Sequence, residues 1–338
     1  ASSWRSSPGR RKKPKKALVV LFHGIDVNTR FDFLRLRTMD FQKDDDVDGL
    51  KYERSLAAAF NDAGFDCVGA DMQSYGRSDG RTGHRAYFED FDHIVDDSFA
   101  VASYAIEAYG SGVPVFFLGV SFGGLVAASV AAECGGGGAP QQQENDDDLP
   151  PRTETRDEQT PEERDLGRDG RRRDDAPHVQ AQRRALVASR LSGLLLLAPA
   201  LSLEKLKKKP TNSLLLPIVS VLATYAPTLA LGEKPEGRYP QILAAMKQDS
   251  TLPFESPHRT GCYHGNFRVR VGKATLDATD RLRDCTLKKS NGSLLFLQSL
   301  PTLIVHSDHD TMTDPDGSLE FADSVNASFL KTQEIPGC

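Results

Sequence analysis

The sequence predicts an α/β fold in which a mostly parallel sheet is covered by helices on both faces. Short, almost uniformly apolar segments such as Ala17–Phe22 are typical of strands buried on both faces. Amphipathic helical segments, such as residues 88–109, lie between these strands along the chain. Strands that alternate with helices build parallel sheets, so we expect the functional loops at the carboxyl ends of the strands.

The expected elements follow one another in a regular order. After the strand at 17–22, further strands are expected at residues 65–70, 113–118, 193–199 and 301–306, with a last one starting within 331–335. Helices are expected at residues 50–63, 88–109, 124–132 and 319–330. Gly64 is a suitable C-terminal stop for the first of these helices.

Two long segments interrupt this alternation. Residues 134–184 are rich in Gly, Gln, Asp and Arg, and they hold too little apolar surface to offset the entropy of ordering. We expect a disordered insertion there, with recruitment of a partner by its mixed charges as the alternative. Residues 200–300 are too long for a simple crossover and predict a helical cap. The core then comprises residues 17–133, 185–199 and 301–338, and the basic segment 1–16 is expected to be disordered.

An apolar stretch within the expected cap, residues 214–231, is broken by Pro217 and Pro227. Two prolines argue against a helix that spans a membrane. We expect a pair of cap helices that line an acyl pocket, and the alternative is that the pair also touches a membrane surface. The expected location is cytoplasmic or peripheral to a membrane.

Composition excludes several classes of function. A net charge of -5 over 338 residues gives no reason to expect a nucleic-acid partner. The five cysteines are scattered and form no C-x-x-C pair, which argues against a disulfide framework or a zinc site and favours a reducing compartment. We expect no cofactor and no metal. Residues 5–16 are basic without an apolar stretch, so they do not form a signal peptide by themselves.

A G-x-S-x-G motif at residues 119–123 carries the candidate chemistry. It lies where the apolar strand 113–118 gives way to a helical segment, which is the context of a nucleophile elbow. In such an elbow the turn is so tight that only glycines fit two residues before and after the serine. Ser121 is therefore the candidate nucleophile, and the alternative is a glycine-rich turn with a capping serine.

A serine nucleophile needs a base, and the base needs an orienting acid. With this elbow the chain order is Ser, then Asp or Glu, then His, so the acid follows a late strand. Asp308, Asp310 and Asp314 compete on spacing alone, although Asp314 before Pro315 is better explained as the start of a helix. The two oxyanion donors are expected to be the N–H groups of Phe122 and Ile25.

The base is not found at its expected place. His23, beside Gly24 at a strand end, is better explained by a structural hydrogen bond than as a base. No histidine follows the acid strand by a further helix and strand. The eight histidines are His23, His84, His93, His178, His258, His264, His306 and His309.

Taken together, the motifs resemble those of a known group. They are His23-Gly24, Asp71 with residues 75–80, residues 119–124, residues 196–199, and residues 306–310 with 313–315. The pattern resembles the monoacylglycerol lipase and lysophospholipase branch of the α/β-hydrolases, the serine aminopeptidase S33-like group. Residues 262–265 are similar to the C-Y-x-G of plant-type members. The resemblance implies an α/β-hydrolase fold with an inserted helical cap.

The resemblance also implies a site and an activity. It selects Asp310 as the catalytic acid, and it supports Ile25 and Phe122 as the oxyanion donors. The implied activity is that of a serine ester hydrolase, which cleaves monoacylglycerols or lysophospholipids through an acyl-enzyme intermediate. The alternative is a non-catalytic lipid-binding or scaffold protein.

The sequence departs from the group at both ends. The group places its catalytic histidine shortly after a Pro-Gly that ends the last strand, and this sequence reaches Pro336-Gly337-Cys338. There is also no room for the group's hairpin before residue 17, and residues 30–48 are longer and more acidic than the usual loop. We therefore expect a fragment cut at both ends that is inactive by itself.

Overall fold

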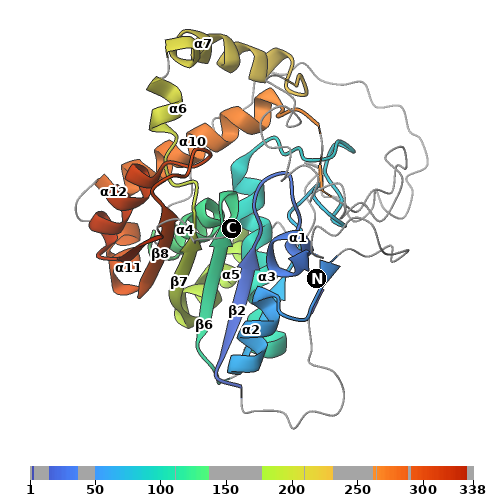
Figure 1. Ribbon diagram of the computed structural model, residues 1–338, viewed down its shortest axis with the longest axis vertical. Helices are drawn as coiled ribbons and strands as arrows, with labels where there is room; N and C mark the ends of the chain where they lie inside the picture. The colour runs from blue at the N-terminus through green and yellow to red at the C-terminus, as the bar shows by residue number, and fades with distance from the viewer. Residues whose placement is uncertain are drawn as a thin grey trace.

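A seven-stranded sheet lies at the centre of the protein, with helices on both of its faces (Figure 1). The computed structural model describes residues 2–3, 15–36, 50–110, 112–136, 177–208, 210–230, 262–263, 265–287 and 291–332. The strands, in sheet order, are β1 (Ser2–Ser3), β5 (Phe65–Gly69), β2 (Ala17–Phe22), β6 (Val115–Val120), β7 (Leu191–Leu197), β8 (Thr302–Ser307) and β9 (Ser328–Thr332). A separate pair is formed by β3 (Arg35–Leu36) and β4 (Leu50–Lys51).

From β5 to β9 the strands pair in parallel, and only β1 is antiparallel to its neighbour. The register aligns the strand ends: Phe22 pairs with Gly119, Val120 with Leu197, and Leu197 with Val305. The loops after β2, β6, β7 and β8 therefore leave the sheet at one edge. This confirms the predicted parallel sheet of an α/β fold.

The helices pack on the sheet through alternate residues of each strand. On one face, Leu18 and Val20 of β2 belong to the large core that contains α3, α4 and α5. On the other face, Val19 and Leu21 belong to a second cluster that includes Phe33 of α1 and Phe60 of α2. The helices are α1 (Thr29–Phe33), α2 (Leu56–Ala63), α3 (Phe91–Tyr109), α4 (Phe122–Gly135), α5 (Pro177–Arg190), α6 (Glu204–Lys208), α7 (Pro210–Tyr225), α10 (Val269–Leu287), α11 (Gly292–Ser299) and α12 (Pro315–Val325).

Two expected helix boundaries are wrong. The helix expected from residue 50 begins at Leu56, because the Ser55 side chain accepts a hydrogen bond from the Ala58 N–H and caps it. The helix expected to reach residue 330 ends at Val325, because Asn326 adopts a left-handed conformation with φ 57°. Strand β9 consequently starts at Ser328, earlier than expected.

The disordered insertion expected at 134–184 is wrong at its ends. Helix α4 continues to Gly135, and α5 already begins at Pro177, so residues 177–184 are helical. Arg184 of α5 contacts Glu133 at 2.9 Å and Asp96 at 3.4 Å, and Val187 is fully buried. These contacts anchor a helix whose polar composition concealed its buried face. Residues 137–176 lie outside the described part of the chain.

The segment expected as a cap, 200–300, contains both cap and core helices. In Figure 1, α7 lies at the top of the view and α10 runs beneath it. Helix α11 instead packs against α4, so the expected cap range includes a helix of the core. The basic segment expected to be disordered also differs, because Ser2–Ser3 pairs with β5. Residues 4–14 and 231–261 lie outside the described part of the chain.

Helix α7 is a single helix that contains Pro217, and Pro227 follows it in a turn. The expected helix pair is therefore one helix in this region. Ile218, Val221 and Tyr225 on α7 are exposed. In the part of the chain that the structure describes, no helix is long and apolar enough to span a membrane.

Candidate active site

Ser121 lies on the tight turn between β6 and α4, with φ 51° and ψ -117°. A positive φ is rare for a residue with a side chain and stores about 1–3 kcal/mol of strain. The flanking glycines make the turn possible. A Cβ added at Gly119 would lie 2.3 Å from the Gly123 carbonyl oxygen, and one at Gly123 would lie 2.1 Å from the Phe22 carbonyl oxygen. The tight turn between strand and helix that the motif predicts is therefore present, and the role of Ser121 as a nucleophile stays a prediction.

The turn is tied to the neighbouring strand through backbone atoms. The Ser121 N–H donates to the Leu197 carbonyl at 3.0 Å, and the Ser121 carbonyl accepts from the Ala200 N–H at 3.0 Å. These bonds hold Ser121 at the end of β7 as well as β6. Its side chain is only partly buried, so the hydroxyl is accessible at the sheet edge.

Phe122, one expected oxyanion donor, directly follows the serine, and Ile25, the other, follows Gly24 in the loop after β2. A Cβ added at Gly24 would lie 3.6 Å from the Cβ of Ser121, which brings the loop after β2 beside the elbow. Among the described residues, no acceptor takes the N–H of Ile25 or of Phe122. The Phe122 ring is held by Phe88 and Phe91, at centroid distances of 5.7 and 5.8 Å.

Asp32, a residue that the sequence analysis did not select, fixes this loop. Its Oδ2 accepts a hydrogen bond from the Gly24 N–H at 2.6 Å. Burial raises the pKa of Asp32 to about 7, although the Gly24 hydrogen bond acts in the opposite direction. No local pattern marks Asp32, because only the folded chain brings α1 against the end of β2.

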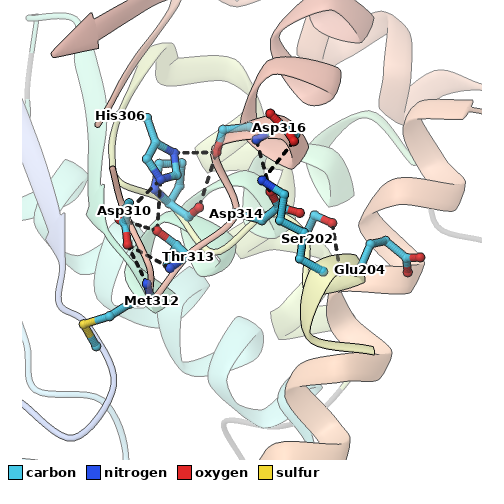
Figure 2. Close-up of polar contacts among 11 residues, drawn as sticks. Ser202, Glu204, His306, Asp310, Met312, Thr313, Asp314 and Asp316 are labelled. Atoms are coloured by element: carbon cyan, nitrogen blue, oxygen red, sulfur yellow. Dashed lines mark hydrogen bonds and ion pairs between the residues drawn. The ribbon is translucent and has the colours of Figure 1, made fainter. Parts of the chain in front are cut away.

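Asp310 lies in the loop after β8, held by three hydrogen bonds (Figure 2). Its Oδ1 accepts from the N–H groups of Met312 at 2.7 Å and Thr313 at 3.0 Å, and its Oδ2 accepts from the Thr313 hydroxyl at 2.7 Å. Burial alone would raise the pKa of Asp310. The hydrogen bonds from Thr313 and Met312, together with His306, outweigh burial and lower the pKa below its ordinary value.

His306, at the end of β8, has partners on both ring nitrogens. Nδ1 lies 2.9 Å from the Ser318 hydroxyl, and Nε2 lies 3.0 Å from the Thr313 hydroxyl and 3.3 Å from Asp310 Oδ2 (Figure 2). Burial lowers the pKa of His306, against the opposing effect of Asp310. The His306 ring therefore supports the loop that carries Asp310, and both of its nitrogens are already in contact with partners.

Asp314 behaves as its sequence context predicted. It is the N-cap of α12, its Oδ1 accepts from the Asp316 N–H at 3.1 Å, and a proline follows it. Lys205 of α6 contacts Asp314 at 3.0 Å and Asp316 at 2.9 Å. These ion pairs join the first cap helix to the loop that carries Asp310. Asp308 is exposed.

His23 has the structural role that was favoured for it. Its Nε2 accepts from the Met72 N–H at 2.8 Å, and Nδ1 contacts the Gly24 carbonyl at 2.7 Å. Burial lowers the pKa of His23, against the opposing effects of Asp71 and the Gly24 carbonyl. Among the described residues, no histidine is hydrogen-bonded to Ser121, and His258 and His264 lie outside them.

Solved structures with the same fold are found by structural comparison. A soluble variant of monoglyceride lipase from Saccharomyces cerevisiae, in complex with a substrate analog, has a TM-score of 0.53 at 15% identity over 94% of this chain and 77% of that chain. A thermostable carboxyl esterase from Bacillus coagulans, in complex with glycerol, has a TM-score of 0.51 at 14% identity over 98% and 88%. At such identities these likenesses establish the α/β-hydrolase fold. A comparison with curated protein sequences finds no significant match.

A family described as serine aminopeptidase, S33 matches residues 49–139 and 179–338. The match covers most of the chain, including the Ser121 elbow and the Asp310 loop. The interruption between the two matched parts falls where the helices α4 and α5 are separated in the sequence. The chain therefore belongs to the serine aminopeptidase S33 family of hydrolases, with the α/β-hydrolase fold.

Proposed function

We propose that the chain is a serine hydrolase that cleaves carboxylic esters, with Ser121 as its nucleophile. The observation that carries this proposal is the strained Ser121 turn with two N–H groups beside it that have no acceptor among the described residues. Backbone strain of this kind persists only where the surroundings impose it, and it is concentrated at functional sites. A capping serine in an ordinary turn would not require it.

In the proposed reaction, Ser121 Oγ attacks the ester carbonyl carbon and loses its proton to a histidine base. The N–H groups of Ile25 and Phe122 stabilise the oxyanion. Phe122 also begins α4, whose N-terminal dipole favours negative charge at this point. The proton then passes to the leaving alkoxide, which leaves an acyl-enzyme ester at Ser121. In the second step the histidine base activates a water molecule, which attacks the acyl-enzyme ester and releases the carboxylic acid and free Ser121.

Asp310 is proposed as the acid that orients the base. It lies one strand from Ser121 at the same edge of the sheet, because β7 separates β6 from β8. Its lowered pKa keeps it ionised at neutral pH, as an orienting carboxylate requires. His23 and His306 are occupied by other partners, so neither is assigned as the base. The histidine base therefore stays unassigned among the described residues, and we propose that turnover is slow where no histidine reaches Ser121.

The proposed substrates are monoacylglycerols or lysophospholipids. Support comes from the motifs shared with that branch of the family and from the fold of a monoglyceride lipase. The exposed apolar side chains of Ile218, Val221 and Tyr225 on α7 also give the cap a surface compatible with acyl chains or with peripheral membrane contact.

A fluorophosphonate probe tests the nucleophile directly, because it reacts with an activated serine. With imidazole added as a base, we expect it to label the chain and not Ser121→Ala, whereas Ser189→Ala, a change at an exposed serine of α5, should label like the parent. Equal labelling of Ser121→Ala would refute the assignment. No labelling of the folded chain, with or without added imidazole, would favour the non-catalytic lipid-binding alternative.

Free imidazole supplies a base from solution, so it tests whether Ser121 lacks one in this chain. We expect imidazole to raise the hydrolysis of monoacylglycerol by the chain above the rate of Ser121→Ala, which measures the uncatalysed background. A lysophospholipid and a peptide anilide should be compared in the same assay to rank ester against amide substrates. Rapid hydrolysis without imidazole would show that a histidine of this chain acts as the base.

A further inference from the structure

A cavity of about 260 Å³ lies outside the candidate active site. Its walls are formed by the loop after β5 and by the segment that precedes α10, with Tyr75, His84, Arg85, Cys262, Tyr263 and Arg268 among the lining residues. Ser121 does not line it. The cavity is connected to the loop after β2, because the Tyr263 N–H donates to the Asp26 carbonyl at 2.7 Å and the Tyr75 ring contacts the His23 ring.

Two buried polar atoms on its walls have no hydrogen-bond partner within the described part of the chain. They are the hydroxyl of Tyr75 and Nε of Arg268. Tyr75 is only 2% exposed, so water does not compensate its hydroxyl at the surface. An unpaired buried donor is costly and is uncommon in native proteins. Both atoms can donate, and a ligand rich in acceptor oxygens would satisfy them.

The two arginines on these walls are held in place in advance. Arg85 donates to the carbonyl of Ser78 at 2.8 Å and to that of Gly76. Arg268 donates to the Thr228 carbonyl at 2.9 Å, and its guanidinium lies 6.0 Å from the centre of the Tyr263 ring. A guanidinium carries five N–H donors, so both retain donors for a ligand. Side chains already ordered lose little entropy on binding.

The charge around the cavity favours an anion. Where the structure describes their surroundings, neither Arg85 nor Arg268 forms an ion pair with a carboxylate. Two carboxylates, Asp71 and Asp79, act to raise the pKa of Arg85, but neither lines the cavity, and Asp71 accepts from the N–H groups of Thr29 and Arg77. The charge of Asp26 contributes to the raised pKa of Tyr75. Burial raises the pKa of Asp26 itself to about 7, so Asp26 is largely neutral under mildly acidic conditions.

We propose that this cavity binds a phosphate group between Arg85 and Arg268, with the Tyr75 hydroxyl as a further donor. Arginine forks match the oxygens of phosphate in geometry as well as in charge. A water molecule occupies about 30 Å³ in the liquid, so the cavity also accommodates a small esterified group. The phosphate can therefore come from a phospholipid head group or from a free anion.

Calorimetric titration of the whole chain at about pH 6, where Asp26 is mostly protonated, tests the proposal. Inorganic phosphate and sn-glycerol 3-phosphate are the two probes, and sodium chloride at equal ionic strength is the control. Both probes should bind. Equal affinities assign the site to the free anion, and tighter binding of glycerol 3-phosphate assigns it to a head group. Absence of binding by both probes at millimolar concentration overturns the proposal.

Three variants locate the binding. Tyr75→Phe removes only a hydroxyl without a partner, so the protein should fold normally and bind phosphate about 5- to 10-fold more weakly. Arg268→Gln should weaken binding about tenfold or more, since it removes a charge-assisted donor. Arg281→Gln makes the same charge change on α10, the helix that follows Arg268, at a residue paired with Asp92, and should bind like the parent.

Unchanged affinity in both Tyr75→Phe and Arg268→Gln would place any phosphate binding elsewhere and overturn the proposal. The parent and Ser121→Ala should bind phosphate equally, because Ser121 does not line the cavity. Failure of the proposed esterase reaction therefore leaves the binding result intact, and failure of binding leaves the labelling of Ser121 intact.

Discussion

The turn at Ser121 and the loop at Asp310 lie at the same edge of the sheet, but different atoms hold them in place. At Ser121, backbone meets backbone: the glycines leave no space for a Cβ, and main-chain hydrogen bonds join the turn to β7. At Asp310, a side chain is one end of every bond: the carboxylate accepts from the N–H groups of Met312 and Thr313 and from the Thr313 hydroxyl, and His306 contacts that hydroxyl. The first arrangement should tolerate no added atom, whereas the second should respond gradually to conservative changes.

The carboxyl groups beside these two segments, Asp32 near the Ser121 turn and Asp310 in its own loop, also differ in pKa. Burial raises the pKa of Asp32 to about 7 beside the oxyanion loop, while hydrogen bonds overcome burial and lower the pKa of Asp310 beside the acid loop. The two sides should therefore respond to pH in different ranges.

The largest expected effect comes from adding one carbon atom at the elbow. In Gly123→Ala the new Cβ would lie 2.1 Å from the Phe22 carbonyl oxygen and 2.6 Å from that of His23, and backbone atoms of a central strand cannot move aside cheaply. We expect the free energy of unfolding to fall by about 3 kcal/mol or more, as measured by urea denaturation.

Gly272→Ala in α10 is the matched control. Its new Cβ would meet the Phe267 ring at 3.5 Å, an ordinary contact, and alanine favours a helix by about 0.5–1 kcal/mol over glycine. The control should be neutral or slightly stabilising. A small effect of Gly123→Ala, similar to that of the control, would show that the elbow can relax.

The second effect concerns pH. A carboxyl whose pKa is raised on folding stabilises the protein fully below its unfolded value near 3.8, and this contribution is lost as the pH rises through about 7. Asn cannot titrate but keeps an oxygen for the Gly24 N–H. Between about pH 5 and pH 8, the parent should therefore lose about 2 kcal/mol more than Asp32→Asn.

Urea denaturation across that range measures the difference between the two proteins. The difference is needed because Asp26 and Glu133, whose pKa values are also raised to about 7, titrate in the same range. Asp310→Asn should leave the slope between about pH 5 and pH 8 unchanged, because a lowered carboxyl pKa acts only as the pH falls below about 3.8. Identical slopes for the parent and Asp32→Asn would contradict this expectation.

The same contrast explains what the sequence could predict. The elbow was predictable because its chemistry is local: the glycines and the serine are adjacent, and their spacing reflects one tight turn. The alternation of apolar strands likewise predicted the sheet. Asp32 and Ser318 were not selected because their partners, Gly24 and His306, are brought to them only by the fold.

Boundaries and polar helices were less predictable. Helix α5 has a buried residue at Val187, but its many arginines made it resemble the charged segment before it. The end of α12 depends on a left-handed conformation at Asn326, which the apolar pattern across residues 319–330 does not show. In both cases the deciding contact lies outside the local pattern.

The third effect tests the side-chain support of the acid loop. Thr313→Val keeps the shape of the residue but removes the hydroxyl that donates to Asp310 and contacts His306. We expect a loss of about 1–2 kcal/mol in the free energy of unfolding at neutral pH. The pKa of Asp310 should also rise, which can be followed by NMR titration. Ser307→Ala, next to the exposed His309, should change stability by less than about 0.5 kcal/mol. Equal effects of the two variants would mean that the loop does not depend on Thr313.

The smallest effect measures the strain at Ser121 itself. Alanine keeps a Cβ at φ 51° and so retains the strain, whereas glycine adopts this conformation freely. Release of about 1–3 kcal/mol of strain is partly offset by the greater entropy of glycine in the unfolded chain. We therefore expect Ser121→Gly to be about 1 kcal/mol more stable than Ser121→Ala, with labelling by the fluorophosphonate abolished in both. Equal stabilities would mean that the turn carries no strain, and the backbone argument for a nucleophile at this position would then lose its physical basis.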